Sequence, residues 1–336
     1  MPKRVGTDTI IMEHALTIVG FAGVAGKKEK NGPLGSLFDR TFEDDKLGQD
    51  SWEAAESGML CNAISLALQK ANLKNDQVQL LFAGDLLDQS IASTFGVKQF
   101  GIPHIGLFGA CSTMALSMGM AAIAVDSGAA QTAVAATGSH FCSAERQFRF
   151  PLEYGGRRTP TSQWTVTGSG AAVLQRGDAA PRVKAVTFGR IQDYGVTDAN
   201  NMGAAMAPAA CSTLKAYFDD THTTPADFDL VLTGDLGQVG SQLLKELLQE
   251  QHYTLGENYN DCGLMIFDME DQGVGAGGSG CGCSGSVVCS KILSELQNGT
   301  LSRVLFCATG ALMSPTSSQQ GLSIPAIAHA VELAVK

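Results

Sequence analysis

The cysteine at position 111 stands at a Gly-Ala step before a long apolar segment, in the stretch GLFGACSTMALSMGMAA (106–122). A thiol in the first turn of a helix lies near unpaired backbone N–H groups and the positive end of the helix dipole, which lower its pKa. The same position suits a small residue that fills a tight turn, because free cysteines are often buried and inert. The segment therefore predicts either a nucleophile or an inert packing residue.

Two further patterns resemble ligand sites but lack residues that such sites need. Cys281 and Cys283 are spaced C-x-C, but neither a second cysteine pair nor a histidine cluster flanks them, which disfavours a zinc site. The Gly-rich segment 274–286 lacks the Lys-Ser/Thr that follows a phosphate-binding loop, so we expect no nucleotide site there. The nine cysteines are odd in number and lie mostly in apolar runs, which predicts reduced thiols in a reducing compartment.

The overall composition is that of a packed globular protein, with 336 residues that are 44% apolar and 17% charged. The net charge of −10 argues against nucleic acid as a partner, because phosphate binding needs clustered Lys and Arg side chains. The apolar segment 15–26 is too short to span a bilayer, so we expect a strand there, no signal peptide and no transmembrane segment. The Lys-rich segment 25–35 could face anionic lipid, but we favour a solvated loop.

Two pairs of segments indicate an internal duplication. Residues 78–90 and 228–240 each contain an apolar strand that ends in Gly-Asp-Leu. Residues 109–139 and 280–311 each contain a Gly/Cys turn, a long helix and a strand. Because the two pairs follow one another in the same order, the chain is expected to consist of two related halves.

Strands and helices alternate in each predicted half, which favours mostly parallel sheets covered by helices. We expect helices over 54–71 and 208–220, long helices that end at Gly128 and Gly299, and closing strands over 167–175 and 324–333. The helix over 113–125 has almost no polar face and should be buried on all sides. The sequence therefore predicts halves 1–178 and 179–336 in a five-layer α-β-α-β-α stack, related by a pseudo-twofold axis, with a cleft between them.

The duplicated halves, the cysteine at a helix start and the Gly-rich C-terminal segments resemble the thiolase and β-ketoacyl synthase superfamily. In that superfamily the cysteine accepts an acyl group, while His or Asn partners stabilise the oxyanion and move protons. The resemblance places Asp235 and Ser279 where these partners would stand, and a carboxylate beside a thiol raises the thiol pKa. His329 could form a Cys–His pair, or could be a structural histidine. We therefore expect Cys111 to mark a vestigial nucleophile position and the protein to be catalytically degenerate.

Within that superfamily, the chain is similar to the stage V sporulation protein AD family of spore-forming bacteria. The resemblance runs nearly end to end and includes the runs Arg-Gln-Phe-Arg and Met-Ala-Pro-Ala-Ala, which are not general thiolase motifs. The matching stretches include AGVAGKKEKNGPLGSLFD (22–39), FAGDLLDQ (82–89), LFGACSTMALS (107–117), AERQFRFPLEYGG (144–156), GRIQDYGVTDANNMGAAMAPAA (189–210), LTGDLGQVGS (232–241) and RVLFCATGALMSPTSSQQ (303–320).

This resemblance implies a thiolase-like fold whose acyl pocket has become a ligand pocket. It implies non-enzymatic binding of dipicolinate, a planar aromatic dianion, and of its calcium chelate, for uptake into the developing spore with integral membrane proteins of the same operon. It implies no cofactor apart from calcium chelated by the ligand, and a peripheral place at the inner membrane of the forespore. A homodimer is typical of the superfamily. Two alternatives stay open: an acyltransferase that uses Cys111, and a purely structural member of a membrane complex.

A pocket for such a dianion should offer guanidinium or backbone N–H donors and few unpaired carboxylates. Backbone N–H groups at the start of the Cys111 helix and three arginines could supply these donors, although surface ion pairs are the alternative for each arginine. The carboxylates would suit a calcium ion that arrives with the ligand, although turn formation or helix capping is the alternative. The candidate ligand-binding residues are Cys111, Ser112, Arg146, Arg149, Arg190, Asp193, Asp198, Asp235, Ser279 and His329.

Overall fold

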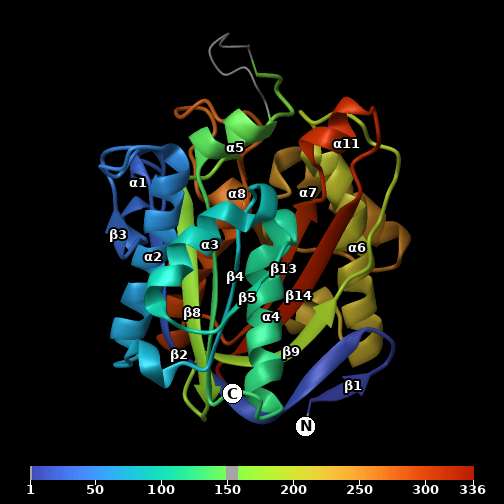
Figure 1. Ribbon diagram of the computed structural model, residues 1–336. Helices are drawn as coiled ribbons and strands as arrows, with labels where there is room; N and C mark the ends of the chain where they lie inside the picture. The colour runs from blue at the N-terminus through green and yellow to red at the C-terminus, as the bar shows by residue number, and fades with distance from the viewer. Residues whose placement is uncertain (1, 149–157) are drawn as a thin grey trace.

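The computed structural model describes residues 2–148 and 158–336 (Figure 1). The first half contains the strands β1 (Lys3–Val5), β2 (Thr9–Ala25), β3 (Arg40–Thr41), β4 (Leu80–Gly84), β5 (His104–Gly106), β6 (Thr132–Ser139), β7 (Trp164–Thr165) and β8 (Gly168–Arg176). Its α-helices are α1 (Lys27–Lys30), α2 (Trp52–Lys70), α3 (Ile91–Val97), α4 (Thr113–Asp126) and α5 (Phe141–Phe148), and a 3-10 turn, η5 (Ala110–Ser112), precedes α4.

The second half repeats this plan with strands and helices in a similar order. Its strands are β9 (Arg182–Phe188), β10 (Leu230–Thr233), β11 (Tyr259–Asp261), β12 (Gly278–Ser279), β13 (Arg303–Ala311) and β14 (Ala326–Ala334). Its helices are α6 (Met202–Thr221), α7 (Gly237–Glu250), α8 (Cys262–Met265), α9 (Cys281–Val287), the π-helical segment η8 (Val288–Ile292), α10 (Leu293–Gln297) and α11 (Pro315–Gln319).

The main sheet is mixed, which corrects the expectation of mostly parallel sheets. Its strand order is β11-β10-β13-β14-β9-β2-β8-β6-β4-β5, and the pairing of β9 with β2 joins the two halves. The strands β4, β5 and β6 pair in parallel, as do β10, β11 and β13, whereas β8 and β14 run antiparallel to their neighbours. A parallel return needs a long crossover. The helix between β13 and β14, α11, has five residues and is about 8 Å long, whereas a nine-residue strand such as β14 is about 30 Å long. This connection is too short for a parallel return, so β14 runs antiparallel to β13.

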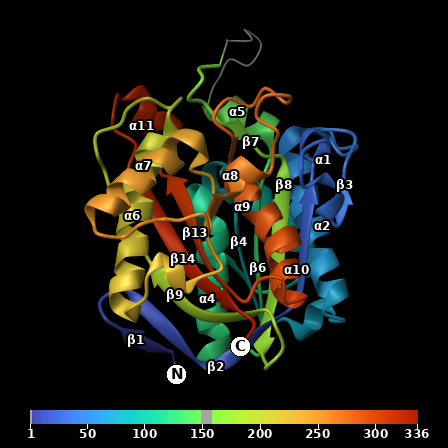
Figure 2. The same cartoon turned by 180° about the vertical axis from the view of Figure 1, so that it is seen from behind.

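The helices form three layers, with the two halves of the sheet between them. Helix α2 packs on the outer face of β2 and β8, and α6 packs on the outer face of β13 and β14. Helix α4 contacts β4 and β6 on one side and β13 and β14 on the other, so it lies between the two halves of the sheet (Figure 2). The second central helix, α9, packs on β6 and β8. This arrangement matches the predicted five-layer stack.

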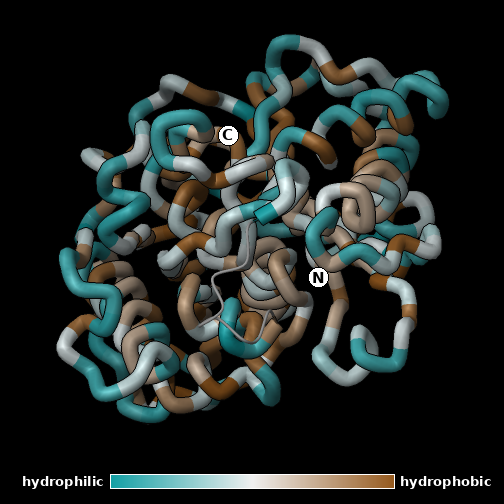
Figure 3. Tube along the Cα trace, turned by 90° about the horizontal axis from the view of Figure 1, so that it is seen from above, coloured by the Kyte–Doolittle hydropathy of each residue, from teal (hydrophilic) through white to brown (hydrophobic). Residues whose placement is uncertain are grey.

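Burial follows this layering closely. Hydrophobic segments lie mainly in the interior and hydrophilic segments at the outer loops (Figure 3). Helix α4 is buried along nearly its whole length, as its lack of a polar face predicts. The predicted glycines after the two long helices, Gly128 and Gly299, both have a φ of 80°, which glycine adopts without strain. The Lys-rich segment 25–35 differs from the expected solvated loop, because it forms α1 and buries Glu29.

Candidate functional site

Cys111 lies in the turn η5, which leads from β5 into the buried helix α4. Ala110, immediately before it, has a left-handed backbone with a φ of 49°, an uncommon conformation for a residue other than glycine. Strand β13 crosses close to this turn, since a Cβ on Gly310 would lie 2.1 Å from the Gly109 carbonyl oxygen. The second half of the chain therefore packs directly on the cysteine turn, and only 5% of Cys111 is exposed.

Asp235 lies beside Cys111 and is fully buried. Its carboxyl group is hydrogen-bonded to the Cys111 thiol. It also accepts hydrogen bonds from the Gly280 N–H at 2.8 Å and the Thr309 hydroxyl at 3.0 Å, and the Ser279 hydroxyl donates to it at 3.4 Å. The structure thus brings together three residues that the sequence singles out: Cys111, Asp235 and Ser279.

Asp235 does not cap helix α7, which was the alternative reading of its position. The side chain of Asp261 instead accepts hydrogen bonds from the backbone N–H groups of Leu236 at 2.9 Å and Gly237 at 3.0 Å. The carboxyl of Asp235 is therefore directed toward the thiol and the Gly-rich segment before α9 rather than toward its own helix.

The electrostatic setting disfavours a thiolate at Cys111. Burial raises the pKa of the Cys111 thiol well above its usual range, and the neighbouring Asp235 carboxyl raises it further. Burial also raises the pKa of Asp235 to about 7, although its hydrogen bonds with Cys111 and Gly280 oppose this shift. The helix position of Cys111 would lower the thiol pKa, but burial and the carboxyl outweigh it.

A narrow cavity of about 40 Å³ lies above Cys111. The cavity is open enough to admit water-sized groups to the neighbourhood of the cysteine. Its wall is largely apolar. The lining residues are Leu86, Phe108, Ala110, Cys111, Ala144, Glu145, Phe148, Thr165, Met202, Ser279, Ala311 and Met313.

Ser112 and His329 do not line this cavity. The hydroxyl and the backbone N–H of Ser112 both donate to the Gly109 carbonyl, at 2.6 and 3.0 Å. His329 lies on β14, where its Nδ1 accepts a hydrogen bond from the Gly189 N–H at 3.3 Å, and burial lowers its pKa to about 4. Among the described residues, no recorded hydrogen bond or ring contact joins His329 to Cys111.

The described arginines of the candidate set lie away from the Cys111 cavity and form ion pairs. Arg146, on α5, pairs with Glu53 of α2. Arg190 pairs with Asp8 at 2.9 Å, and 63% of its side chain is exposed. Arg149 lies outside the described residues. The described geometry therefore places neither Arg146 nor Arg190 among the residues that line the Cys111 cavity.

Asp193 and Asp198 lie in an exposed segment between β9 and α6 and hold turns there. The Asp193 carboxyl accepts hydrogen bonds from the Gly195 N–H at 3.0 Å and the Ser323 hydroxyl at 2.6 Å. The Asp198 carboxyl accepts one from the Asn200 N–H at 2.9 Å. These contacts fit turn formation, which the sequence analysis gave as the alternative to a ligand-binding role for these carboxylates.

The cysteines are free thiols, and seven of the nine are buried. Cys281 donates a hydrogen bond to the Gly138 carbonyl, and Cys283 to the Gly234 carbonyl. Within residues 2–148 and 158–336, no group of three or more His, Cys, Asp and Glu side chains is arranged to hold a metal ion.

Two residues of the site were missed by the sequence analysis. The Gln163 side chain donates to the Asp235 carbonyl at 2.7 Å and so fixes the Asp235 backbone, but no sequence pattern marks it. Thr309, which donates to the Asp235 carboxyl, could have been found from the duplication. Its counterpart in the first half is Thr137, which donates to the Gly84 carbonyl at 2.8 Å.

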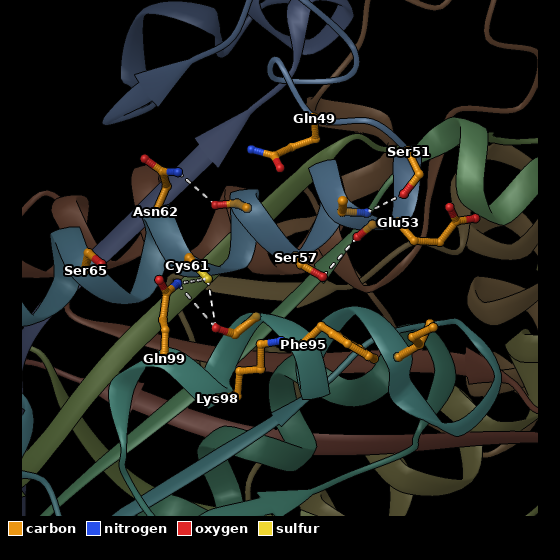
Figure 4. Close-up of a pocket in the computed structure, with 14 residues that line it drawn as sticks. Gln49, Ser51, Glu53, Ser57, Cys61, Asn62, Ser65, Phe95, Lys98 and Gln99 are labelled. Carbon is orange, nitrogen blue, oxygen red and sulfur yellow. Dashed lines mark hydrogen bonds between the residues drawn. The ribbon is translucent and has the colours of Figure 1, made fainter.

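A larger groove of about 700 Å³ lies between α2 and α3, away from Cys111 (Figure 4). Its polar side chains bond within the protein: Ser57 donates to the Ala92 carbonyl and Asn62 to the Gly58 carbonyl. Phe95, on α3, contributes exposed apolar surface. We assign no ligand to this groove.

None of the helices in the described part of the chain combines the length and the apolar character needed to cross a membrane.

Comparison with known proteins identifies close relatives along the whole chain. The family described as stage V sporulation protein AD matches residues 6–334. The stage V sporulation protein AD of Bacillus subtilis (strain 168) is 47% identical over 329 residues, which cover 98% of this chain and 97% of the relative.

Solved structures with a similar fold include a 3-oxoacyl-[acyl-carrier-protein] synthase III and OleA. The 3-oxoacyl-[acyl-carrier-protein] synthase III of Aquifex aeolicus VF5 has a TM-score of 0.58 and 14% identity, covering 95% of this chain and 99% of that one. Cerulenin-bound OleA of Xanthomonas campestris has a TM-score of 0.60 and 16% identity, covering 96% and 97%. At this level of identity the similarity shows the fold alone, and it confirms the expected thiolase-like architecture.

Proposed function

The chain belongs to the stage V sporulation protein AD family, and on that premise we propose that it is a non-enzymatic binding protein for dipicolinate and its calcium chelate. In this proposal it works in uptake of the ligand into the developing spore, together with integral membrane proteins of the same sporulation operon. It would lie at the periphery of the inner membrane of the forespore. The wider role in sporulation follows from the family itself.

The observation that carries the non-enzymatic part is the pairing of Cys111 with Asp235. Acyl transfer to a cysteine requires the thiolate, and a neighbouring base or cation normally supplies it. Here the neighbour is an acid in a buried setting, and both groups retain their protons more strongly than usual. At neutral pH the thiolate is therefore scarce, and acyl transfer has no activated nucleophile.

The backbone near the thiol supports the same conclusion. An acyl-transfer site needs N–H donors aimed at the developing oxyanion. The Gly280 N–H is hydrogen-bonded to the Asp235 carboxylate at 2.8 Å, and the Ser112 N–H to the Gly109 carbonyl at 3.0 Å. Two N–H groups close to the thiol are thus already used by the protein.

One observation favours the alternative, an acyltransferase that uses Cys111. The left-handed Ala110 and the buried helix α4 present the cysteine at a sharp turn, as a nucleophile would be presented. This alternative predicts stoichiometric labelling by an acyl-coenzyme A at neutral pH, which is lost in Cys111→Ala. Our proposal predicts that neither the wild type nor the variant is labelled.

The test of the proposed function is calorimetric titration of the full chain with dipicolinate, with and without calcium. We expect saturable binding in at least one condition, in the absence of any acyl labelling. Absence of heat in both conditions would overturn dipicolinate binding. If the protein nevertheless captured the membrane proteins of its operon, the purely structural role would replace it.

A further inference from the structure

Three of the large apolar side chains that the fold leaves exposed lie in two short segments beside each other. Ile191 and Tyr194, in the segment before α6, are 61% and 68% exposed, and Leu322, which follows α11, is 55% exposed. Apolar side chains are often exposed singly, but a cluster of them marks a contact surface. We refer to these three residues as the loop patch. Figure 1 shows α11 at the end of the molecule opposite the chain termini.

Hydrogen bonds hold the two segments together, so the loop patch is a fixed feature of the surface. The backbones of Gln192 and Ala326 exchange two hydrogen bonds, each of 2.8 Å. The Ser323 hydroxyl donates to the Asp193 carboxyl at 2.6 Å. Three of these four residues are sequence neighbours of the loop patch. The apolar side chains are therefore presented together before any partner binds, which lowers the entropic cost of binding.

The charges beside the loop patch do not suit an anionic partner. Within residues 190–200 and 316–326 the charged residues are Arg190, Asp193 and Asp198, which is one positive and two negative charges. The guanidinium of Arg190 is already ion-paired, and both carboxyls accept hydrogen bonds within their own loop. Attraction to the loop patch therefore comes from apolar contact and not from a cationic surface.

The size of the loop patch decides between a protein and a lipid partner. At these exposures the three side chains present roughly 300 Å² of surface, whereas a specific protein–protein interface buries about 800 Å² on each partner. A protein partner also needs a closely complementary shape. A bilayer needs neither, because lipids adapt to the side chains that enter them. Tyrosine, with an apolar ring and a polar hydroxyl, suits the boundary between headgroups and acyl chains.

We propose that the loop patch inserts into the headgroup region of a lipid bilayer and holds the protein at the membrane surface. The surface it fits is zwitterionic, such as phosphatidylcholine, because the two segments carry more negative than positive charge. The inference deepens the proposed function by naming the part of the chain that faces the membrane. It rests on the proposed function only for the identity of that membrane.

The two segments also lead to the Cys111 cavity. Met202 follows the first segment and Met313 precedes the second, and both methionines line the cavity. A bilayer contact at the loop patch would therefore bring the membrane surface next to the chain segments that form one wall of the cavity. This placement connects the membrane contact with the region of Cys111.

The first test is co-sedimentation of the full chain with vesicles of phosphatidylcholine. Tyr194→Ser should weaken binding about tenfold, because it removes the most exposed apolar side chain of the loop patch. The matched control is Phe95→Ser, which removes an aromatic ring on α3 that is 56% exposed, and which should leave binding unchanged. Adding phosphatidylglycerol to the vesicles should not strengthen binding, and added salt should not weaken it.

A fluorescent side chain at the same position measures insertion directly. Tyr194→Trp keeps an aromatic ring in the loop patch, and its fluorescence should be quenched by vesicles of dibrominated phosphatidylcholine. Phe95→Trp is the matched control and should not be quenched. The two native tryptophans, Trp52 and Trp164, are present in both variants, so the difference between the variants reports the loop patch.

Three results would overturn the lipid contact: no vesicle binding, an equal loss in Phe95→Ser, or no quenching of Tyr194→Trp. Binding that needs phosphatidylglycerol and is lost in Lys27→Ala would also overturn it, and would transfer the contact to the Lys-rich segment 25–35. If vesicles are not bound and Tyr194→Ser instead lowers the molecular mass in solution, a second copy of the chain covers the loop patch.

Titration of the same proteins with dipicolinate separates the two proposals. Calorimetric binding of dipicolinate without any vesicle binding would overturn the lipid contact and leave the proposed function standing. Vesicle binding that is weakened in Tyr194→Ser, without any binding of dipicolinate, would support the lipid contact and overturn the ligand in the proposed function.

Discussion

Two buried carboxyl groups in this protein share a pKa of about 7 and have opposite surroundings. Asp235 is surrounded by donors of the protein itself: the Cys111 thiol, the Gly280 N–H and the Thr309 hydroxyl. Glu29 accepts a hydrogen bond from the Thr167 N–H on one oxygen, while its other buried oxygen has no hydrogen-bond partner among the described residues. The protein satisfies the first carboxyl group fully and the second only in part.

This difference shows that a raised pKa alone does not identify a working site. Burial is the leading cause of the shift in both groups. The two carboxyl groups differ in the hydrogen-bonding capacity that the protein leaves unused: both oxygens of Asp235 have partners, whereas Oε2 of Glu29 has none among the described residues.

The largest expected effect comes from removing the carboxyl that the protein satisfies internally. Asp235→Ala would leave the Gly280 N–H and the Thr309 hydroxyl buried without an acceptor. We expect the free energy of unfolding to fall by about 2–4 kcal/mol, measured by chemical denaturation. Asp193→Ala, which removes an exposed carboxyl that also accepts two hydrogen bonds, is the control and should have little effect. Equal effects of the two substitutions would contradict the structural role of Asp235.

Glu29→Gln should raise the free energy of unfolding at alkaline pH, whereas Asp235→Ala lowers it. Because the folded-state pKa of Glu29 is raised from 4.5 to about 7, its protonated form stabilises the fold below pH 4.5, and this stabilisation is lost as the pH rises through 7. At pH 8 the variant should therefore be more stable than the wild type by about 3 kcal/mol, and at pH 4 the two should be similar. Denaturation at the two pH values measures this difference. A pH-independent difference would show that Glu29 does not titrate in this range.

A smaller effect is expected on the reactivity of the thiol. Asp235→Asn removes the charge beside Cys111 but leaves the burial, which is the larger cause of the raised pKa. Alkylation of Cys111 by iodoacetamide, followed by mass spectrometry, should accelerate by no more than about tenfold. Cys142, which lies near Asp45 and Glu145 instead, serves as the internal control. An acceleration of many hundredfold would show that Asp235 alone restrains an otherwise competent nucleophile.

The smallest effect is expected for Arg190→Ala. This arginine is exposed and pairs with Asp8, and such surface pairs contribute about 0–1 kcal/mol. Binding of dipicolinate, measured by calorimetry, should be the same as in the wild type. A clear loss of affinity would instead place the ligand close to Arg190, beyond the end of β9.

The fold and part of the site were predictable because they depend on local patterns. The duplicated Gly-Asp-Leu strands, the apolar segment 113–125 and the cysteine turn all indicate the layered fold, and the superfamily resemblance places Asp235 beside Cys111. The mixed pairing of the sheet was not predictable from the alternation of strands and helices along the chain. It depends on the direction in which the last strand of each half, β8 or β14, returns to the sheet. The burial of Glu29 depends on contacts between segments distant in sequence, such as that of Glu29 with Thr167, which no local pattern reveals.

The most direct test of this account is incubation of the full chain with an acyl-coenzyme A at neutral pH, followed by mass spectrometry of Cys111. The account predicts no acyl label, because burial and the neighbouring Asp235 carboxyl raise the pKa of the thiol well above its usual range. Stoichiometric labelling that is lost in Cys111→Ala would contradict the central claim that Cys111 is not an activated nucleophile.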